Sequence, residues 1–118
     1  MVISGYSIGH CSKPELATGV TVLLFEQTVI ATCLICGSAP ATREVALLAP
    51  DAMVPSIDAL VFAGGSAFGL GAADGVMQWL RERQRGFATA GGRVPIVPTA
   101  CIYDLNVTRP GFPTATDA

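Results

Sequence analysis

The stretch from Asp58 to Gly86 reads DALVFAGGSAFGLGAADGVMQWLRERQRG. It joins a short apolar strand, a turn at Gly64-Gly65-Ser66, and a sequence with helical spacing. A strand-to-helix turn of this kind presents backbone N–H groups and a hydroxyl at the mouth of a sheet. We therefore expect ligand binding or chemistry at this turn.

The segment after the turn predicts an amphipathic helix from Leu70 to Arg85. Leu70, Ala73, Met77 and Leu80 share one face of it. Gly86, which follows basic side chains, is a suitable residue to end the helix. The first turns are rich in small residues, and their glycines lower helix propensity, so we expect backbone to pack closely against them.

The predicted strand before the turn is Ile57–Ala63, and two segments with high strand propensity precede it in the sequence. Thr18–Phe25 and Thr28–Ile35 are separated only by Glu26-Gln27, which favours an antiparallel hairpin. Ile3–His10 is a further candidate strand, ending where a loop begins at Cys11. A hairpin-rich sheet covered on one face by the helix is an α+β fold.

The remaining segments are less regular. Thr42 can cap a short helical turn that Pro50 stops. Val94–Val97 and Ala100–Tyr103 read as strand pieces, and the prolines within and between them predict an edge or an irregular segment. We place one domain portion at residues 1–105, followed by an irregular, apparently truncated tail at residues 106–118.

Composition indicates a protein that needs a partner. The 118 residues are 51% hydrophobic and 14% charged, with a net charge of −2 and a mean hydropathy of +0.53. Soluble domains average about 25% charged residues, so we expect apolar surface to be covered by other subunits or by the rest of a longer protein. The basic residues form no stripe for nucleic acid. No signal peptide or membrane span is evident, which favours a cytoplasmic protein.

Four cysteines provide no clear metal or disulfide pattern. Cys33 and Cys36 form a C-x-x-C inside the predicted Thr28–Ile35 strand region, where residues three apart point to opposite faces. We expect Cys11, Cys33, Cys36 and Cys101 to be buried free thiols, and we expect no metal or cofactor.

Known catalytic motifs match the turn incompletely. A nucleophile elbow needs glycine at the position of Phe68, and the only histidine, His10, precedes Ser66 instead of following it. The glycines are not followed by the lysine of a phosphate-binding loop. The turn can thus be a tight packing device, a small-ligand site, or part of an active site completed elsewhere.

Other polar residues have plainer roles beside functional ones. Asp74 is expected on the flank of the helix, and Arg43-Glu44 is expected to form a local ion pair. His10, at a strand end, is expected to be structural. Asp104 can cap the backbone that follows it.

Several segments resemble those of one hydrolase family, and they occur in that family's order. They are SIGH (Ser7–His10), TGVTVLLF (Thr18–Phe25), PATREVALL (Pro40–Leu48), IDALVFAGGSAFGLGAADGVMQWL (Ile57–Leu80) and GRVPIVPTACIYDL (Gly92–Leu105). The chain resembles the P1 family of aminopeptidases, the DmpA-like group of peptidase family S58, which includes β-aminopeptidases and nylon-oligomer hydrolases. The resemblance covers nearly the whole chain up to Leu105.

The resemblance implies a fragment of a layered DmpA/ArgJ-like sandwich, from a self-cleaving enzyme whose nucleophile is a new N-terminal Ser or Thr. That residue is expected beyond residue 118, on a missing C-terminal part. The implied enzyme hydrolyses N-terminal residues of small peptides or amides and is a homo-oligomer. The alternatives are a non-catalytic domain that associates with a partner chain, and a small-ligand-binding module that uses the glycine turn.

The resemblance also gives the turn a role in the cleft. Gly64, Gly65, Ser66 and Phe68 are its candidate cleft and oxyanion residues. Relatives often have Tyr at the position of Phe68, where the hydroxyl helps to hold the oxyanion. Because Phe68 has no hydroxyl, a donor here must be a backbone N–H or Ser66. Ser38, Ala41 and the Val45-Ala46 pair also depart from the family's usual residues.

Overall fold

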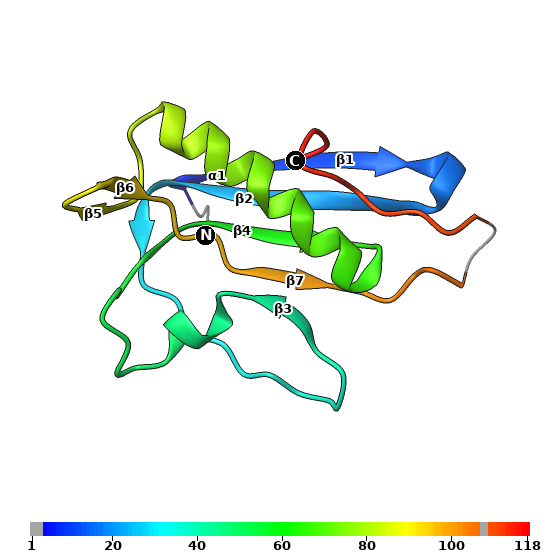
Figure 1. Cartoon of the computed structure of the whole chain (residues 1–118), viewed down its shortest axis with the longest axis horizontal. Coiled ribbons are helices and arrows are strands. Elements are labelled where there is room, and N and C mark those ends of the chain that lie inside the picture. Colours follow the sequence, from blue (N-terminus) through cyan, green and yellow to red (C-terminus); the bar gives the residue numbers. More distant parts are fainter. Residues whose placement is uncertain (1–3, 107–108) are drawn as a thin grey trace.

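Strand β4 (Ile57–Ala63) is the centre of a five-stranded sheet in the computed structural model, which describes residues 4–106 and 109–118. The order is β1-β2-β4-β7-β3, with β1 at Tyr6–Lys13, β2 at Thr18–Val29, β7 at Thr99–Cys101 and β3 at Ala41–Arg43. Among the strand pairs of the described residues, β4–β7 is parallel and the others are antiparallel. The predicted α+β fold, a sheet with one helix on it, is confirmed (Figure 1).

The remaining elements are short. Three 3-10 helices span Pro14–Leu16, Val45–Leu48 and Ser66–Ala72, named η1, η2 and η3. One α-helix, α1, occurs in the described part of the chain and spans Ala73–Glu82. A separate two-stranded hairpin, β5 (Phe87–Thr89) with β6 (Gly92–Val94), lies beside one end of the sheet (Figure 1).

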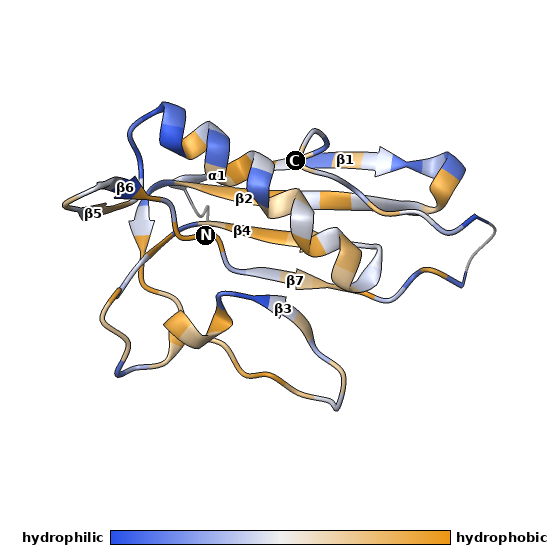
Figure 2. Cartoon of the chain, viewed as in Figure 1, coloured by the Kyte–Doolittle hydropathy of each residue, from blue (hydrophilic) through white to orange (hydrophobic). Residues whose placement is uncertain are grey.

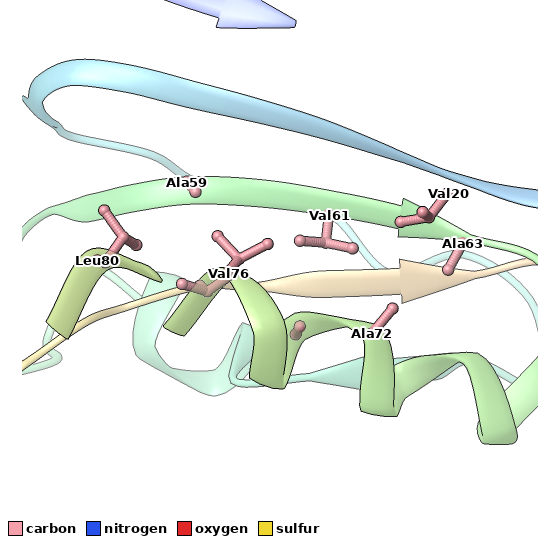
Figure 3. Close-up of a cluster of buried hydrophobic side chains, with 9 residues drawn as sticks. Val20, Ala59, Val61, Ala63, Ala72, Val76 and Leu80 are labelled. Atoms are coloured by element: carbon pink, nitrogen blue, oxygen red, sulfur yellow. The ribbon is translucent and has the colours of Figure 1, made fainter. Parts of the chain in front are cut away.

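The core lies between α1 and one face of the sheet. Because side chains alternate along a strand, Ala59, Val61 and Ala63 all point toward the helix, and each is 5% exposed or less. Figure 3 shows them facing Val76 and Leu80. The polar side of α1 is turned outward, as the sequence pattern predicts (Figure 2).

The helix differs from its prediction at both ends. Residues 66–72 form the tighter 3-10 helix η3, so α1 begins at Ala73 and not at Leu70. The helix stops at Glu82, because Gln84 adopts a left-handed conformation (φ 54°). Gly86, the predicted end, is also left-handed, but it turns the chain toward β5.

Close backbone packing at the glycines is confirmed. A Cβ on Gly69 would overlap the carbonyl oxygen of Gly64, and one on Gly75 would overlap that of Ala115 in the tail. Gly71, in the same 3-10 helix, has no heavy atom within 4 Å of such a Cβ. Glycine is thus sterically required at Gly69 and Gly75 but not at Gly71.

The predicted hairpin between Thr18 and Ile35 is wrong. Strand β2 runs without a turn through Glu26-Gln27, pairing with β1 on one edge and β4 on the other. Neither residue supplies the positive φ of a two-residue hairpin turn. Residues 30–36 form no strand, and Ile30 and Leu34 are 85% and 86% exposed.

Three other boundary predictions need correction. Strand β1 continues through Cys11 to Lys13 and begins at Tyr6, while Ile3 of the predicted Ile3–His10 strand lies outside the described residues. Thr42 lies in β3 and caps nothing, and Glu44 is at the start of η2. β7 is an internal strand, although Pro95 and Pro98 do keep residues 95–98 irregular, as expected.

The tail has no helix or strand among its described residues, 109–118. It nevertheless contacts the rest of the molecule: Pro113 is buried, and Asp117 forms an ion pair with Lys13 of β1 (2.8 Å). This ion pair lowers the pKa of Asp117 and raises the pKa of Lys13. The tail therefore lies along the α1 side of the sheet (Figure 1).

We predict that Gly69→Ala destabilises the chain and that Gly71→Ala does not. The first change forces a methyl group against a backbone carbonyl, and overpacking of this kind costs about 1–3 kcal/mol. The second adds helix propensity worth about 0.5–1 kcal/mol in open space. Urea unfolding followed by circular dichroism measures both. Equal stabilities of the two variants would contradict the predicted close contact.

Candidate functional site

The turn at Gly64-Gly65-Ser66 follows β4 directly, at the edge where the parallel strand β7 also ends. Gly65 (φ 83°) and Ser66 (φ 55°) are both left-handed. A left-handed serine is uncommon, and such residues concentrate at functional sites. The turn carries this strain because neighbouring segments hold each of its N–H groups.

Three hydrogen bonds fix the turn. The N–H of Gly64 donates to the carbonyl of Gly19 (2.9 Å), and that of Ser66 donates to the carbonyl of Ile102 (2.9 Å). The N–H of Gly65 donates to Oδ1 of Asp104 (2.6 Å). The expectation of free N–H groups at these three positions is therefore corrected: each already has a protein acceptor.

The Ser66 hydroxyl is the polar group that the turn still offers. It makes no hydrogen bond within residues 4–106 and 109–118, and Ser66 is half-buried. Phe68, two residues on, is 64% exposed. Its ring stacks on Phe112 of the tail, with centroids 5.1 Å apart and planes 21° apart.

The structure gives Asp104 a different role from the one predicted from the sequence. Within residues 4–106 and 109–118 its carboxylate makes no hydrogen bond to the backbone that follows it. Its carboxylate instead accepts hydrogen bonds from the Gly65 N–H and from the Thr18 hydroxyl (2.7 Å). The parallel register places Ala63 beside Cys101, so the segments leaving β4 and β7 run together. A parallel pairing of the strands that precede Gly65 and Asp104 is the feature from which this contact could have been predicted.

A hollow of about 540 Å³ lies beside the turn. Its lining includes Gly64, Thr18 and Asp104, and also His10 and Phe62 from the sheet. Gly65, Ser66 and Phe68 do not line it. A second hollow, about 370 Å³, lies between α1 and β1 and contains none of the four candidate residues. The hollow beside Gly64 is therefore the one close to the candidate chemistry.

The other polar residues that the sequence singles out make contacts within the fold. Arg43 does not pair with Glu44; its Nη1 contacts Oδ1 of Asp74 (2.6 Å) and so ties β3 to α1. Asp74, with its side chain 63% exposed, lies on the helix flank as expected. His10 lies within β1, not at its end, and its Nδ1 bonds the Thr21 hydroxyl (2.9 Å).

The cysteines are free thiols, but not all of them are buried. Cys33 and Cys36 are exposed, since residues 30–36 are not a strand, whereas Cys11 and Cys101 are partly buried. No group of three or more His, Cys, Asp or Glu side chains suited to a metal occurs among the residues that the structure describes. In that same part of the chain, no helix has the length and apolar character needed to cross a bilayer.

Comparisons with known proteins agree on one family. A family model described as peptidase family S58 matches residues 2–115. An uncharacterized aminopeptidase of Mycobacterium leprae is 47% identical over 113 residues, covering 89% of this chain and 31% of the relative. One of Mycobacterium tuberculosis has the same identity, with 33% of its length covered. The chain thus spans about a third of the length of the curated relatives it matches.

We predict that Cys101 reacts with iodoacetamide more slowly than Cys33 and Cys36. Burial raises the pKa of the Cys101 thiol, and only the thiolate is nucleophilic. At pH 8 mass spectrometry of tryptic peptides should show Cys101 labelled after Cys33 and Cys36, with the difference in rate narrowing at higher pH. Labelling in urea is the control, because unfolding should equalise the rates. Equally fast labelling of native Cys101 would contradict its burial.

Proposed function

The chain belongs to peptidase family S58, and on this premise we propose that it forms the N-terminal portion of an aminopeptidase or amidase with an N-terminal nucleophile. The observation that carries the proposal is the family match over residues 2–115, together with relatives named aminopeptidases that are about three times as long. The proposed reaction is hydrolysis of the bond after the N-terminal residue of a small peptide or amide.

The proposal places the nucleophile outside residues 1–118. Ser66 is the serine at the turn, and a serine hydroxyl needs a base close to it to attack an amide. The single histidine, His10, is hydrogen-bonded to Thr21 instead. An N-terminal Ser or Thr avoids this requirement, because its own α-amine can accept the proton.

In this assignment the turn is one wall of the cleft. Developing negative charge on the carbonyl oxygen is stabilised by donors that are already fixed before reaction. The Ser66 hydroxyl is such a donor candidate, since the N–H groups of residues 64–66 are held by Gly19, Asp104 and Ile102. Phe68 and Phe112 offer an apolar surface beside it.

The sheet offers a place for the remaining polypeptide. The face turned away from α1 includes Phe62 and Ile8, both 49% exposed, whereas Val61 on the helix face is 1% exposed. Exposed apolar surface on the sheet favours association with further protein. We propose that the C-terminal portion covers this face and brings the nucleophile to the edge where β4 ends.

Co-expression with the C-terminal two-thirds of the Mycobacterium tuberculosis relative tests the function. We expect the pair to release amine from β-alanyl, D-alanyl or aminohexanoyl amides, while each part alone does not, because the cleft needs both. Intact-mass analysis should show a second polypeptide that begins with Ser or Thr.

Two outcomes would count against this function. Turnover by the 118-residue chain alone would place the nucleophile within it. A stable complex that hydrolyses none of these amides would favour the alternative of a non-catalytic association domain. Replacing the new N-terminal Ser or Thr with Ala is the control, since it should abolish turnover.

A further inference from the structure

Asp104 connects three segments that are distant in sequence. Its Oδ1 accepts the Gly65 N–H (2.6 Å) and its Oδ2 accepts the Thr18 hydroxyl (2.7 Å). Gly65 belongs to the candidate turn, while Thr18 begins β2. One carboxylate therefore ties the turn both to the segment after β7 and to the start of the β2 strand.

The Asp104 carboxylate lies so close to Gly64 that only glycine fits at this position. A Cβ on Gly64 would overlap both Oδ2 of Asp104 and Oγ1 of Thr18. On the other side, a Cβ on Gly65 would overlap the Cβ of Phe112. The glycines are thus enclosed between Asp104 and the tail, and the turn has no room to shift toward either.

The hydrogen bond from Gly65 to Asp104 also affects Ser66 and Phe68, because it restrains the backbone that leads to them. Gly65 and Ser66 are consecutive left-handed residues, a conformation that serine adopts only where its surroundings impose it. A hydrogen bond from an N–H to a carboxylate is stronger than one to a neutral acceptor. Asp104 therefore supplies the strongest of the hydrogen bonds that hold this conformation, and with it the direction of the Ser66 side chain.

We propose that Asp104 is a positioning residue of the active site, which acts through Gly65 to hold Ser66 and Phe68 in the orientation that the complete cleft requires, without touching substrate. This inference rests on the proposed function of the turn. It assigns a role to a residue outside the four candidates, and Thr18 shares that role, because its hydroxyl holds the second carboxylate oxygen.

The structure supplies a matched control in Asp58. This residue lies in β4 at the end away from the turn, is 1% exposed, and accepts the Ile96 N–H through Oδ2 (2.9 Å). Asp58→Asn and Asp104→Asn make the same chemical change in carboxylates that each hold a backbone N–H. Only the second should affect the turn.

Kinetics of the reconstituted pair test the proposal. Displacement of a catalytic group by about 1 Å can reduce rates about 100-fold, so we expect Asp104→Ala to lower kcat at least about tenfold with KM within about twofold of wild type. Asp104→Asn, which keeps an acceptor for Gly65, should lose less. Asp58→Asn should leave kcat unchanged even if it lowers the unfolding midpoint.

Amide spectra of the 118-residue chain give a readout that does not require activity. Asp104→Asn should shift the Gly65, Ser66 and Phe68 resonances, and Asp58→Asn should not. An inactive wild-type pair would defeat the proposed function, and the amide shifts would still decide whether Asp104 sets the turn. Unchanged kcat in Asp104→Ala, an equal loss in Asp58→Asn, or unmoved Ser66 and Phe68 signals would overturn the positioning role.

Discussion

Contact between backbones, made possible by missing side chains, is the constraint on which the rest of this structure depends. The glycine at position 69 lets η3 rest against the Gly64 carbonyl, and the buried alanines of α1 and β4 continue this close approach. Only then can Val76 and Leu80 reach the sheet, where Leu80 is fully buried. The glycines that lower helix propensity therefore also allow the helix to be positioned.

The same approach explains why the helix begins as a 3-10 helix. Glycine-rich sequence has little preference for the α conformation, and the chain must turn sharply from Ala63 into η3 over Gly64-Gly65. The tighter 3-10 geometry, with i→i+3 hydrogen bonds, is frequent at the ends of α-helices. Left-handed backbone at Gly65 and Ser66 is the local consequence, and Asp104 and the Ile102 carbonyl stabilise it.

The sequence predicts those parts of the fold in which local pattern and burial agree. Strand β4 has the predicted bounds because its apolar run lies at the centre of the sheet and is mostly buried. The amphipathic pattern of α1 correctly predicts which side of the helix packs against the sheet. The prediction of a strand at Thr28–Ile35 is wrong although its β-branched residues favour strands. A hairpin partner would have to pair with an edge of β2, and β4 already occupies that edge. Strand propensity cannot reveal which edges are already paired.

The candidate turn shows the same division between local and long-range information. Its position after β4 and its glycines follow from the local sequence, but its hydrogen-bond acceptors are Gly19, Ile102 and Asp104, which lie between 36 and 45 positions from their donors. These partners all lie within this chain, so the turn is fixed before any further polypeptide docks. A site completed by association then orders fewer groups at that moment, and donors held in advance need no reorganisation during reaction. In the proposed arrangement the chain contributes rigidity to the cleft, and the C-terminal portion contributes the nucleophile.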